Sequence, residues 1–386
     1  MFFNLPILRI IILRAIESMC FVINGWILIS SNSEGFLLAE FIALMTIPNF
    51  ISVVILGRIT DKYDAIRILM TSDITLAFIS VIFFTAWIYQ EVSIENIILI
   101  YTFCLMSVVQ VTNVTGRAIY RQYFEEDTVR KETFRYTSAS FAGYIAENLV
   151  AGIAIRVFED YSSAILSVIL SIALIFISMS IKKSFPNRDR IKFNEEQTNF
   201  SLFELINKSP SYLIGFSTFI ASLPLIYGLF QAVSYQRFES MDDVATLYLV
   251  FSAGVIVGSY YIRKLTISYK QSFAFIALLF LSLIFVSSDI SKVQTYLAIF
   301  IVGLVFSSQN IFLINIQNCV PPSQTGRLVS TSIIIGSIIG ILSSQLIDTS
   351  NNLMFAPVVF GIIMSLFITL SIIYEKQKSF QKRYNS

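Results

Sequence analysis

The sequence predicts an all-α membrane protein with twelve transmembrane helices in two pseudo-symmetric six-helix bundles. Three observations lead to this prediction: 55% of the residues are hydrophobic, only 13% are charged, and apolar segments recur at the length of a membrane span. A soluble domain carries about 25% charged residues. One helix crosses the bilayer core with about 20 apolar residues. The 386 residues therefore accommodate twelve spans, provided that the connecting loops are short.

Six apolar runs precede a polar stretch and six follow it. We expect an N-terminal bundle at 1–181, a cytoplasmic linker at 182–209 and a C-terminal bundle with a cytoplasmic tail at 210–386. The first run contains Arg9 and Arg14, and because no small-residue cleavage site follows it, we expect it to remain as the first helix. The expected spans are 6–30, 35–57, 66–88, 96–118, 136–157, 161–181, 210–235, 243–262, 271–289, 293–318, 328–347 and 353–374.

A short similarity between the halves supports this division. The sequence RYTS begins at Arg135, before the fifth span, and RLVS begins at Arg327, before the eleventh. Gly143 and Gly336 follow at similar distances. The two halves are therefore expected to be repeats of one six-helix unit.

The basic residues predict the orientation. With both termini in the cytoplasm, 22 of the 27 lysines and arginines fall in inside segments and only three in outside segments. Cytoplasmic loops of membrane proteins carry such an excess of positive charge. We expect a multi-pass protein of a bacterial cytoplasmic (inner) membrane, with N and C termini on the cytoplasmic side.

Several classes of function are disfavoured by what the sequence lacks. It contains no histidine, which excludes a Ser-His-Asp triad and histidine-ligated metals. It also lacks the G-x-x-x-x-G-K-[ST] loop that holds nucleotide phosphates. We therefore expect no enzyme, no catalytic residues, no cofactor and no metal. The expected partners are a small-molecule substrate, a gradient of protons or another ion, and the lipid bilayer, with no nucleic acid and a monomeric chain.

The loop between the second and third spans carries a motif, GRITDKYDAIRIL, from Gly57 to Leu69. It resembles the loop signature of the major facilitator superfamily, G-x-x-x-D-[RK]-x-G-[RK]-[RK]. Gly57, Asp61, Lys62 and Arg67 match, whereas Asp64 replaces the second glycine. The resemblance implies a conformational latch that joins helix two to helix eleven and stabilises the outward-facing state. The alternative is an ordinary charged cytoplasmic turn.

Within that superfamily the chain is most similar to the macrolide-efflux type of drug exporters. These share an Asp-x-x-Asp loop after helix two and a Gly-Arg pair before helix eleven, here Asp61 to Asp64 and Gly326-Arg327. The resemblance implies efflux, antiport and multidrug or macrolide resistance. One departure concerns helix five, where the Gly-Pro pair typical of drug-proton antiporters is replaced by Glu147-Asn148.

Three carboxylates inside the spans are candidates for proton coupling, because a charge at bilayer depth costs about 2.5 kcal/mol or more and usually has a function. Glu147 lies near the middle of helix five and is the first candidate. Glu17 is the second, although Arg14, three residues earlier, can pair with it on the same helix face. Asp73 is the third, but it stands only seven residues into helix three, where water can hydrate it. Each has a packing role as its alternative.

Polar side chains gather in spans one, four, seven and ten, which the resemblance implies line a central cavity. The alternative is hydrogen bonding between helices, which stabilises membrane proteins by about 0.6 kcal/mol per bond. The substrate-cavity candidates are Asn24, Gln110, Asn113, Tyr227, Gln231, Gln309 and Asn310.

The sequence thus favours a secondary active transporter. Our first hypothesis is proton-coupled export of a small amphipathic molecule, such as a drug, a natural product or a metallophore, by alternating access. The second is nutrient symport or uptake on the same fold. The third is a membrane immunity or sensor protein that binds its ligand without transporting it.

Overall fold

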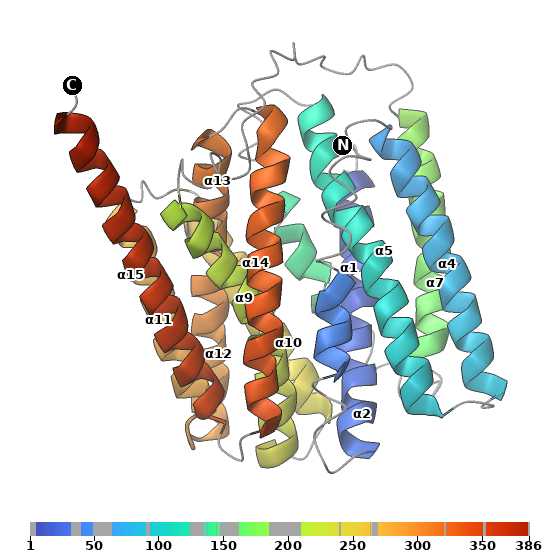
Figure 1. The fold of residues 1–386 in the computed structure, drawn as a ribbon. Helices are drawn as coiled ribbons and strands as arrows, with labels where there is room; N and C mark the ends of the chain where they lie inside the picture. The colour runs from blue at the N-terminus through green and yellow to red at the C-terminus, as the bar shows by residue number, and fades with distance from the viewer. Residues whose placement is uncertain are drawn as a thin grey trace.

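The fold is described by a computed structural model in which helices predominate (Figure 1). The residues that it describes are 5–31, 40–48, 64–89, 93–123, 135–136, 138–143, 145–146, 162–184, 210–238, 241–262, 264, 269–319, 322–349 and 353–384.

The first, seventh and tenth spans are each built from consecutive pieces. The first consists of α1, a π-helical segment η1, and α2; the seventh ends in a second π-helical segment, η3; and the tenth is divided into α12 and α13 by a turn at Ser307 and Ser308. Residues 40–48 are also helical. The bounds are α1 Leu5–Met19, η1 Cys20–Asn24, α2 Gly25–Ser31, α4 Ala65–Tyr89, α5 Ile94–Tyr123, α7 Ser162–Ser184, α9 Pro210–Val233, η3 Ser234–Phe238, α10 Met241–Ile262, α11 Tyr269–Ser287, α12 Lys292–Phe306, α13 Gln309–Cys319, α14 Pro322–Thr349 and α15 Phe355–Tyr384.

The prediction of a helical membrane protein is confirmed. Within the described residues, helix lies in every one of the twelve predicted spans. Seven helices in this part of the chain are long and apolar enough to cross a membrane. Figure 1 shows both ends of the chain at the same end of the helices, as an even number of crossings requires.

The helices form two groups with matching contacts (Figure 1). In the first group α4 packs on α5 and α7, and in the second α11 packs on α12 and α15. Similarly, α1 contacts α7 and α5, as α9 contacts α15 and α13. Each of these contacts in one group therefore has a counterpart in the other, which is the pseudo-symmetry that the sequence predicted.

The two glycines singled out in the sequence occupy equivalent places. A Cβ added at Gly143 would collide with the carbonyl oxygen of Ile11, on the first helix of its group. A Cβ added at Gly336 would lie 2.7 Å from the carbonyl oxygen of Ser217, on the first helix of the other group. Small residues at such positions let membrane helices approach closely. The similarity between Gly143 and Gly336 therefore reflects one repeated helix contact.

The closest helix contact of this kind joins α10 to α12. Gly254 and Gly258, four residues apart, face the backbone of α12 at Phe300 and Leu304. Gly303 of α12 in turn faces the backbone carbonyl of Phe251. This reciprocal packing is the small-xxx-small pattern of membrane helix pairs.

The two groups meet along the first and seventh spans and also where the fifth span contacts the eighth and the tenth. Trp26 of α2 lies edge-on to Tyr235 of η3, with ring centroids 6.3 Å apart. Deeper in the bundle, Phe141 lies edge-on to Phe251 and Phe306 at 5.8 and 6.3 Å. These aromatic contacts belong to one buried apolar core that extends through both groups.

Candidate functional site

Helix α1 carries two ion pairs on different faces. Arg9 and Arg14 are five residues apart, which corresponds to about 140° around a helix of 3.6 residues per turn. The two guanidinium groups therefore contact different helices, and each has its own carboxylate partner.

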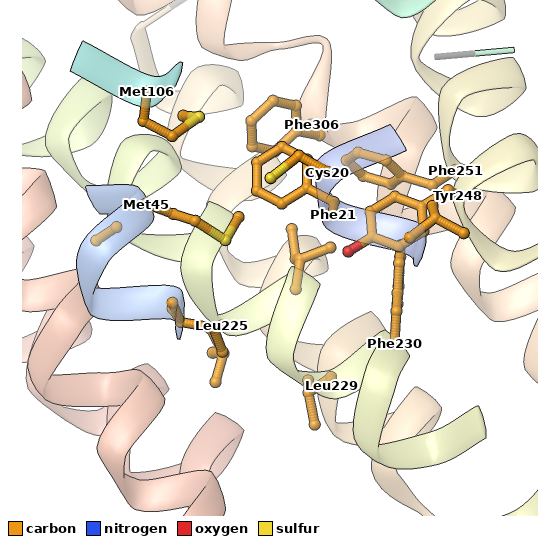
Figure 2. Packing of buried hydrophobic residues seen from close by; sticks show 14 of the residues in the cluster. Cys20, Phe21, Met45, Met106, Leu225, Leu229, Phe230, Tyr248, Phe251 and Phe306 are labelled. Carbon is orange, nitrogen blue, oxygen red and sulfur yellow. The ribbon is translucent and has the colours of Figure 1, made fainter. Parts of the chain in front are cut away.

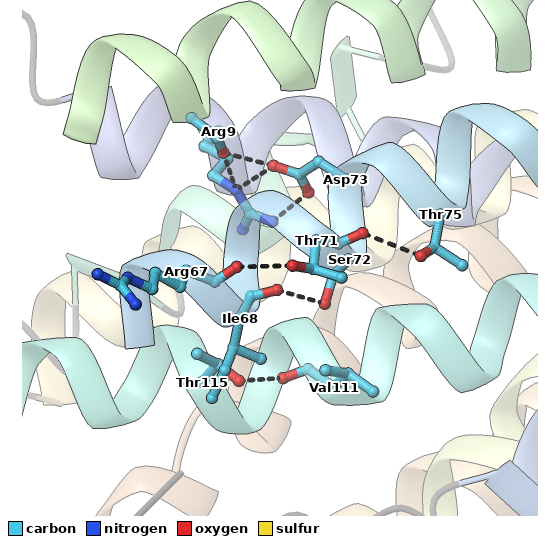
Figure 3. A network of polar contacts seen from close by, with 10 residues as sticks. Arg9, Arg67, Ile68, Thr71, Ser72, Asp73, Thr75, Val111 and Thr115 are labelled. Atoms are coloured by element: carbon cyan, nitrogen blue, oxygen red, sulfur yellow. Dashed lines mark hydrogen bonds and ion pairs between the residues drawn. The ribbon is translucent and has the colours of Figure 1, made fainter. Parts of the chain in front are cut away.

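The first pair joins three helices. Arg9 of α1 and Asp73 of α4 are both buried and form an ion pair through Nη2 and Oδ1. Arg9 Nε also donates to Asp73 Oδ2 and to Ser178 Oγ of α7, each at 3.0 Å. The Ser178 hydroxyl donates to Asp73 in turn. Figure 3 shows Arg9 and Asp73 facing each other across the interface between their helices.

This geometry changes the interpretation of Asp73. The sequence placed it near the interface, where water was expected to hydrate it, but Asp73 is fully buried. That expectation was wrong because Arg9 supplies the compensating charge from a neighbouring helix. Asp73 accepts hydrogen bonds from Arg9 Nε and from the Ser178 hydroxyl in addition to the ion pair, which suits a fixed anchor between α1, α4 and α7.

The second pair faces the other side of α1. Arg14 and Glu17 form the ion pair expected from their spacing, and Glu17 is buried. Arg14 Nη2 donates to Asn113 Oδ1 of α5 at 2.8 Å. The hydroxyl of Tyr136, at the start of the fifth span, donates to the same oxygen at 3.2 Å. Two of the predicted site residues, Glu17 and Asn113, are therefore joined through Arg14.

A third polar cluster surrounds Asn24 in η1. The hydroxyl of Ser163 in α7 donates to Asn24 Oδ1 at 2.9 Å. The Asn24 amide donates to the Cys20 sulfur at 3.5 Å, and that sulfur is 3.3 Å from the hydroxyl of Thr102 in α5. These bonds hold the π-helical segment of the first span against α5 and α7. They match the alternative interpretation of Asn24, which is hydrogen bonding between helices.

A further hydrogen bond between spans joins the two groups of helices. Gln231 of α9 donates from Nε2 to the backbone carbonyl of Phe21 at 2.8 Å. The Phe21 ring lies 4.7 Å from the ring of Tyr227, measured between centroids. Gln231 and Tyr227, both predicted as cavity residues, thus contact the first span directly.

The other cavity candidates have different surroundings. Gln110 is half-buried on α5, and Gln309 is half-buried as the first residue of α13. Asn310 is buried and donates to the carbonyl of Ser307 at 3.2 Å. Asn310 therefore stabilises the turn that divides the tenth span.

Most of the predicted latch lies outside the described residues, namely Gly57, Asp61 and Lys62. The same is true of Glu147. Arg67 is described: its side chain is 82% exposed and its Nε lies 3.9 Å from Asp64 Oδ2. Asp64 accepts a hydrogen bond from the Ile66 N–H at 2.9 Å and so caps the N-terminus of α4. This role explains an aspartate where the superfamily signature has glycine.

Several residues that take part in these contacts were not predicted from the sequence. Arg9 and Asp73 were considered separately, although two opposite charges inside apolar spans are a signal that they pair. Ser178 and Tyr136 gave no signal, because serine and tyrosine are common in membrane helices. Phe21 was not singled out, since its part in the contact with Gln231 is played by the backbone carbonyl.

The distribution of charge distinguishes the two bundles. In the described spans of the N-terminal bundle, α1 and α4 carry four buried or part-buried charges, on Arg9, Arg14, Glu17 and Asp73. In the described spans of the C-terminal bundle, charged residues lie only near helix ends. No group of three or more acidic or thiol side chains able to hold a metal occurs in the described ranges.

Comparison with known proteins agrees with this architecture. The family model of the Major Facilitator Superfamily matches residues 11–344. No curated protein sequence matches the chain.

Three solved structures are similar to the chain over almost their whole length. A bacterial homologue of the human lysosomal transporter Spinster, inward-facing and unoccupied, matches at TM-score 0.65 and 14% identity, covering 97% of this chain and 98% of that one. The nucleoside transporter NupG matches at 0.62 and 16%, covering 97% and 99%. A bacterial homologue of the iron transporter ferroportin, outward-facing, matches at 0.68 and 12%, covering 97% and 99%. At these identities the similarity concerns the fold.

Proposed function

Because the chain belongs to the major facilitator superfamily, and is thus a multi-pass membrane transporter with the fold of secondary transport by alternating access, we propose that it exports a small amphipathic molecule in exchange for protons. The residues 11–344 that match the family cover most of both predicted bundles, and the twelfth predicted span, 353–374, follows the match. The fold accounts for two bundles that rock about a site between them.

One observation carries the proposal: a buried carboxylate, Glu17, lies in a polar network that joins α1, α5 and the start of the fifth span. Its partner Arg14 contacts both Glu17 and Asn113. When the helices move, Arg14 can therefore leave Glu17 and remain hydrogen-bonded to Asn113. Carboxylates inside membrane spans are rare and typically mark proton or ion pathways. We therefore propose Glu17 as the coupling carboxylate within the described residues, with Glu147 as a second candidate.

The opposite surfaces of the two bundles support an amphipathic cargo. The N-terminal bundle offers the charged network around Arg14, and the C-terminal bundle offers aromatic side chains, among them Phe230, Phe251 and Phe306. We propose that a molecule bound between the bundles contacts both the polar network and these aromatic side chains. Such pockets bind ligands with an apolar body and a few polar groups.

The described contacts between the bundles also support alternating access. Phe21 and Trp26 contact the second half of the seventh span, on the side predicted to face outward. We propose that these contacts close the site toward the outside, and that the latch residues Gly57, Asp61, Lys62 and Arg67 stabilise the opposite state.

Transport in intact cells tests the function. Cells that produce the protein should accumulate less of a labelled lipophilic drug than cells without it, and collapse of the proton gradient should abolish the difference. Glu17→Gln and Glu147→Gln should each be measured, with Glu95→Gln, in the first turn of α5, as the control for loss of a carboxylate.

The same measurement separates the alternatives. Raised accumulation that depends on the gradient would favour uptake, and protection of cells that persists without the gradient would favour a non-transporting immunity or sensor protein. If Glu17→Gln and Glu147→Gln both retain gradient-dependent export, proton coupling through these carboxylates is wrong.

A further inference from the structure

The contact between the bundles places one aromatic ring among several others. The ring of Phe21, in η1, lies 4.7 Å from Tyr227 of α9 and 6.5 Å from Tyr248 of α10 between centroids, stacked on the latter at 18°. Phe230 lies edge-on to Tyr248 at 5.2 Å. Figure 2 shows Phe21, Tyr248 and Phe230 converging from their three helical segments. Phe21 thus occupies an aromatic site formed by the other bundle.

A polar group stands beside these rings. Gln231 is 2% exposed, and its Nε2 donates to the Phe21 carbonyl. A carbonyl oxygen can only accept, so this bond fixes the orientation of the amide. Gln231 Oε1 cannot bond to this carbonyl, and it has no hydrogen-bond partner within the described part of the chain. A buried acceptor without a donor is unfavourable, because it has lost its hydrogen bonds to water without replacing them.

The space beside Gln231 is fitted to its amide group. A Cβ added at Gly25 would lie 2.8 Å from Gln231 Nε2 and 3.2 Å from the Phe41 ring. The first span therefore has no side chain where the amide lies. The side chain of Gln231 therefore extends from α9 to the first span. Its Nε2 is hydrogen-bonded there, and its Oε1 has no donor among the described residues.

We propose that the transported substrate is a planar aromatic or heteroaromatic molecule with an amide-type edge, an N–H beside a C=O, and that it binds in the place of Phe21. This inference rests on the proposed function, since the site opens only when the two bundles separate. The ring of the substrate stacks on Tyr227 and Tyr248. Its C=O accepts from Gln231 Nε2, and its N–H donates to Gln231 Oε1.

The chemistry of a primary carboxamide supports this class of ligand. It presents a donor and an acceptor side by side, and the complementary pair is found in amides and lactams. A ligand without that edge leaves polar atoms of Gln231 buried and unpaired. Sites built to hydrogen-bond a substrate group discriminate strongly against analogues that lack the group.

Phe21 then acts as an internal competitor. Its ring and its carbonyl occupy the positions of the substrate ring and the substrate C=O. Binding of substrate and contact between the bundles at Phe21 are therefore mutually exclusive, so the substrate favours the state in which the first and seventh spans are apart.

Two probes with the same fused ring system test the proposal: 2-quinolone, which has a lactam edge, and quinoline, which does not. Binding to the full-length protein in lipid nanodiscs would be measured by titration calorimetry. We expect the wild type to bind 2-quinolone at least about tenfold more tightly than quinoline, as loss of a buried pair predicts. Gln231→Leu should abolish the preference. Gln236→Leu, the same change at an exposed glutamine of η3, should retain it.

Further variants make the result unambiguous. If thermal unfolding shows that Gln231→Leu is not folded, Gln231→Met replaces it, because methionine has a similar unbranched shape but neither the amide donor nor the amide acceptor. Phe21→Leu should strengthen 2-quinolone binding several-fold by removing the competing ring.

The proposal is overturned by equal affinities in the wild type, by no binding of either probe, or by a preference that survives in both Gln231 variants. None of these outcomes would contradict gradient-driven transport, because the Glu17 and Glu147 variants test that function separately.

Discussion

The side-chain amide of Gln231 hydrogen-bonds to the backbone carbonyl of Phe21, 210 positions earlier in the chain, and so connects the two bundles. Aromatic contacts surround this bond on the described helices. Because it joins elements that must separate during alternating access, its strength should influence which state is populated.

Gly25→Ala tests that influence. The added Cβ would lie 2.8 Å from Gln231 Nε2, so the amide that bonds to the Phe21 carbonyl must shift from its position. We expect the first and seventh spans to separate more often, and the emission of Trp26, which lies beside Tyr235, to shift to the red in a Trp87→Phe background. Gly361→Ala is the control, since its Cβ would meet nothing closer than 3.6 Å. Identical emission from both variants would argue against a strained contact at Gly25.

Asp73→Asn should destabilise the protein by about 3–5 kcal/mol, because it leaves the Arg9 guanidinium buried without a counter-charge. The measurement is thermal or denaturant unfolding in detergent. The double variant Arg9→Met, Asp73→Leu should recover most of the loss, since apolar replacement of a buried ion pair is often nearly neutral.

The same double variant decides whether Asp73 couples to protons. Export that still depends on the gradient in a folded protein without both charges would contradict Asp73 as a coupling residue. It would leave Asp73 with the anchoring role that its contacts with Arg9 and Ser178 suggest.

Asn113→Leu and Tyr136→Phe should differ in their effects on transport. Asn113 Oδ1 accepts a charge-assisted bond from Arg14 at 2.8 Å, whereas the bond from Tyr136 is neutral and longer, at 3.2 Å. Bonds to charged groups contribute about 1.5–3 kcal/mol and neutral ones about 1 kcal/mol. Transport rates of the single and double variants should show the larger loss for Asn113→Leu and a non-additive double. Additive losses would mean that the two bonds do not act on one group.

Gly303→Ala should prevent close packing of α10 and α12, because the new Cβ would collide with the backbone carbonyl of Phe251. Backbone cannot move aside as a flexible side chain can, so we expect a lower unfolding temperature and less protein in the membrane. Gly361→Ala again serves as the matched control, and equal yields and unfolding temperatures for the two would contradict the close contact.

The spans could be predicted because membrane helices must satisfy their backbone hydrogen bonds internally and must match the bilayer thickness. Both constraints are visible in a single apolar run. The π-helical segments η1 and η3 and the turn at Ser307 and Ser308 could not be predicted. The π-helical segments have no sequence signal of their own, and η1 is engaged in contacts with distant helices, such as the bond from Gln231 to Phe21.

The site was predictable where its partners are close in sequence. Arg14 and Glu17, three residues apart on one helix, could be paired from their spacing. Arg9 and Asp73 are 64 residues apart and on different helices, so their register is set by packing of α1 on α4 and α7. The proposed coupling by Glu17, and the remaining candidates for cavity and latch, stay predictions for the experiments above.

The ion pair between Arg9 and Asp73 also has a consequence for biosynthesis. Arg9 reaches the translocon before Asp73 has been translated, and Ser178 is made 169 residues after Arg9. An unpaired arginine costs about 2.5–3.5 kcal/mol at the centre of an inserting helix. The first helix should therefore be held at the lipid boundary, with Arg9 toward the headgroups, until the third helix arrives. The final depth of the first helix in the membrane would then be set only after Asp73 and Ser178 have been synthesised.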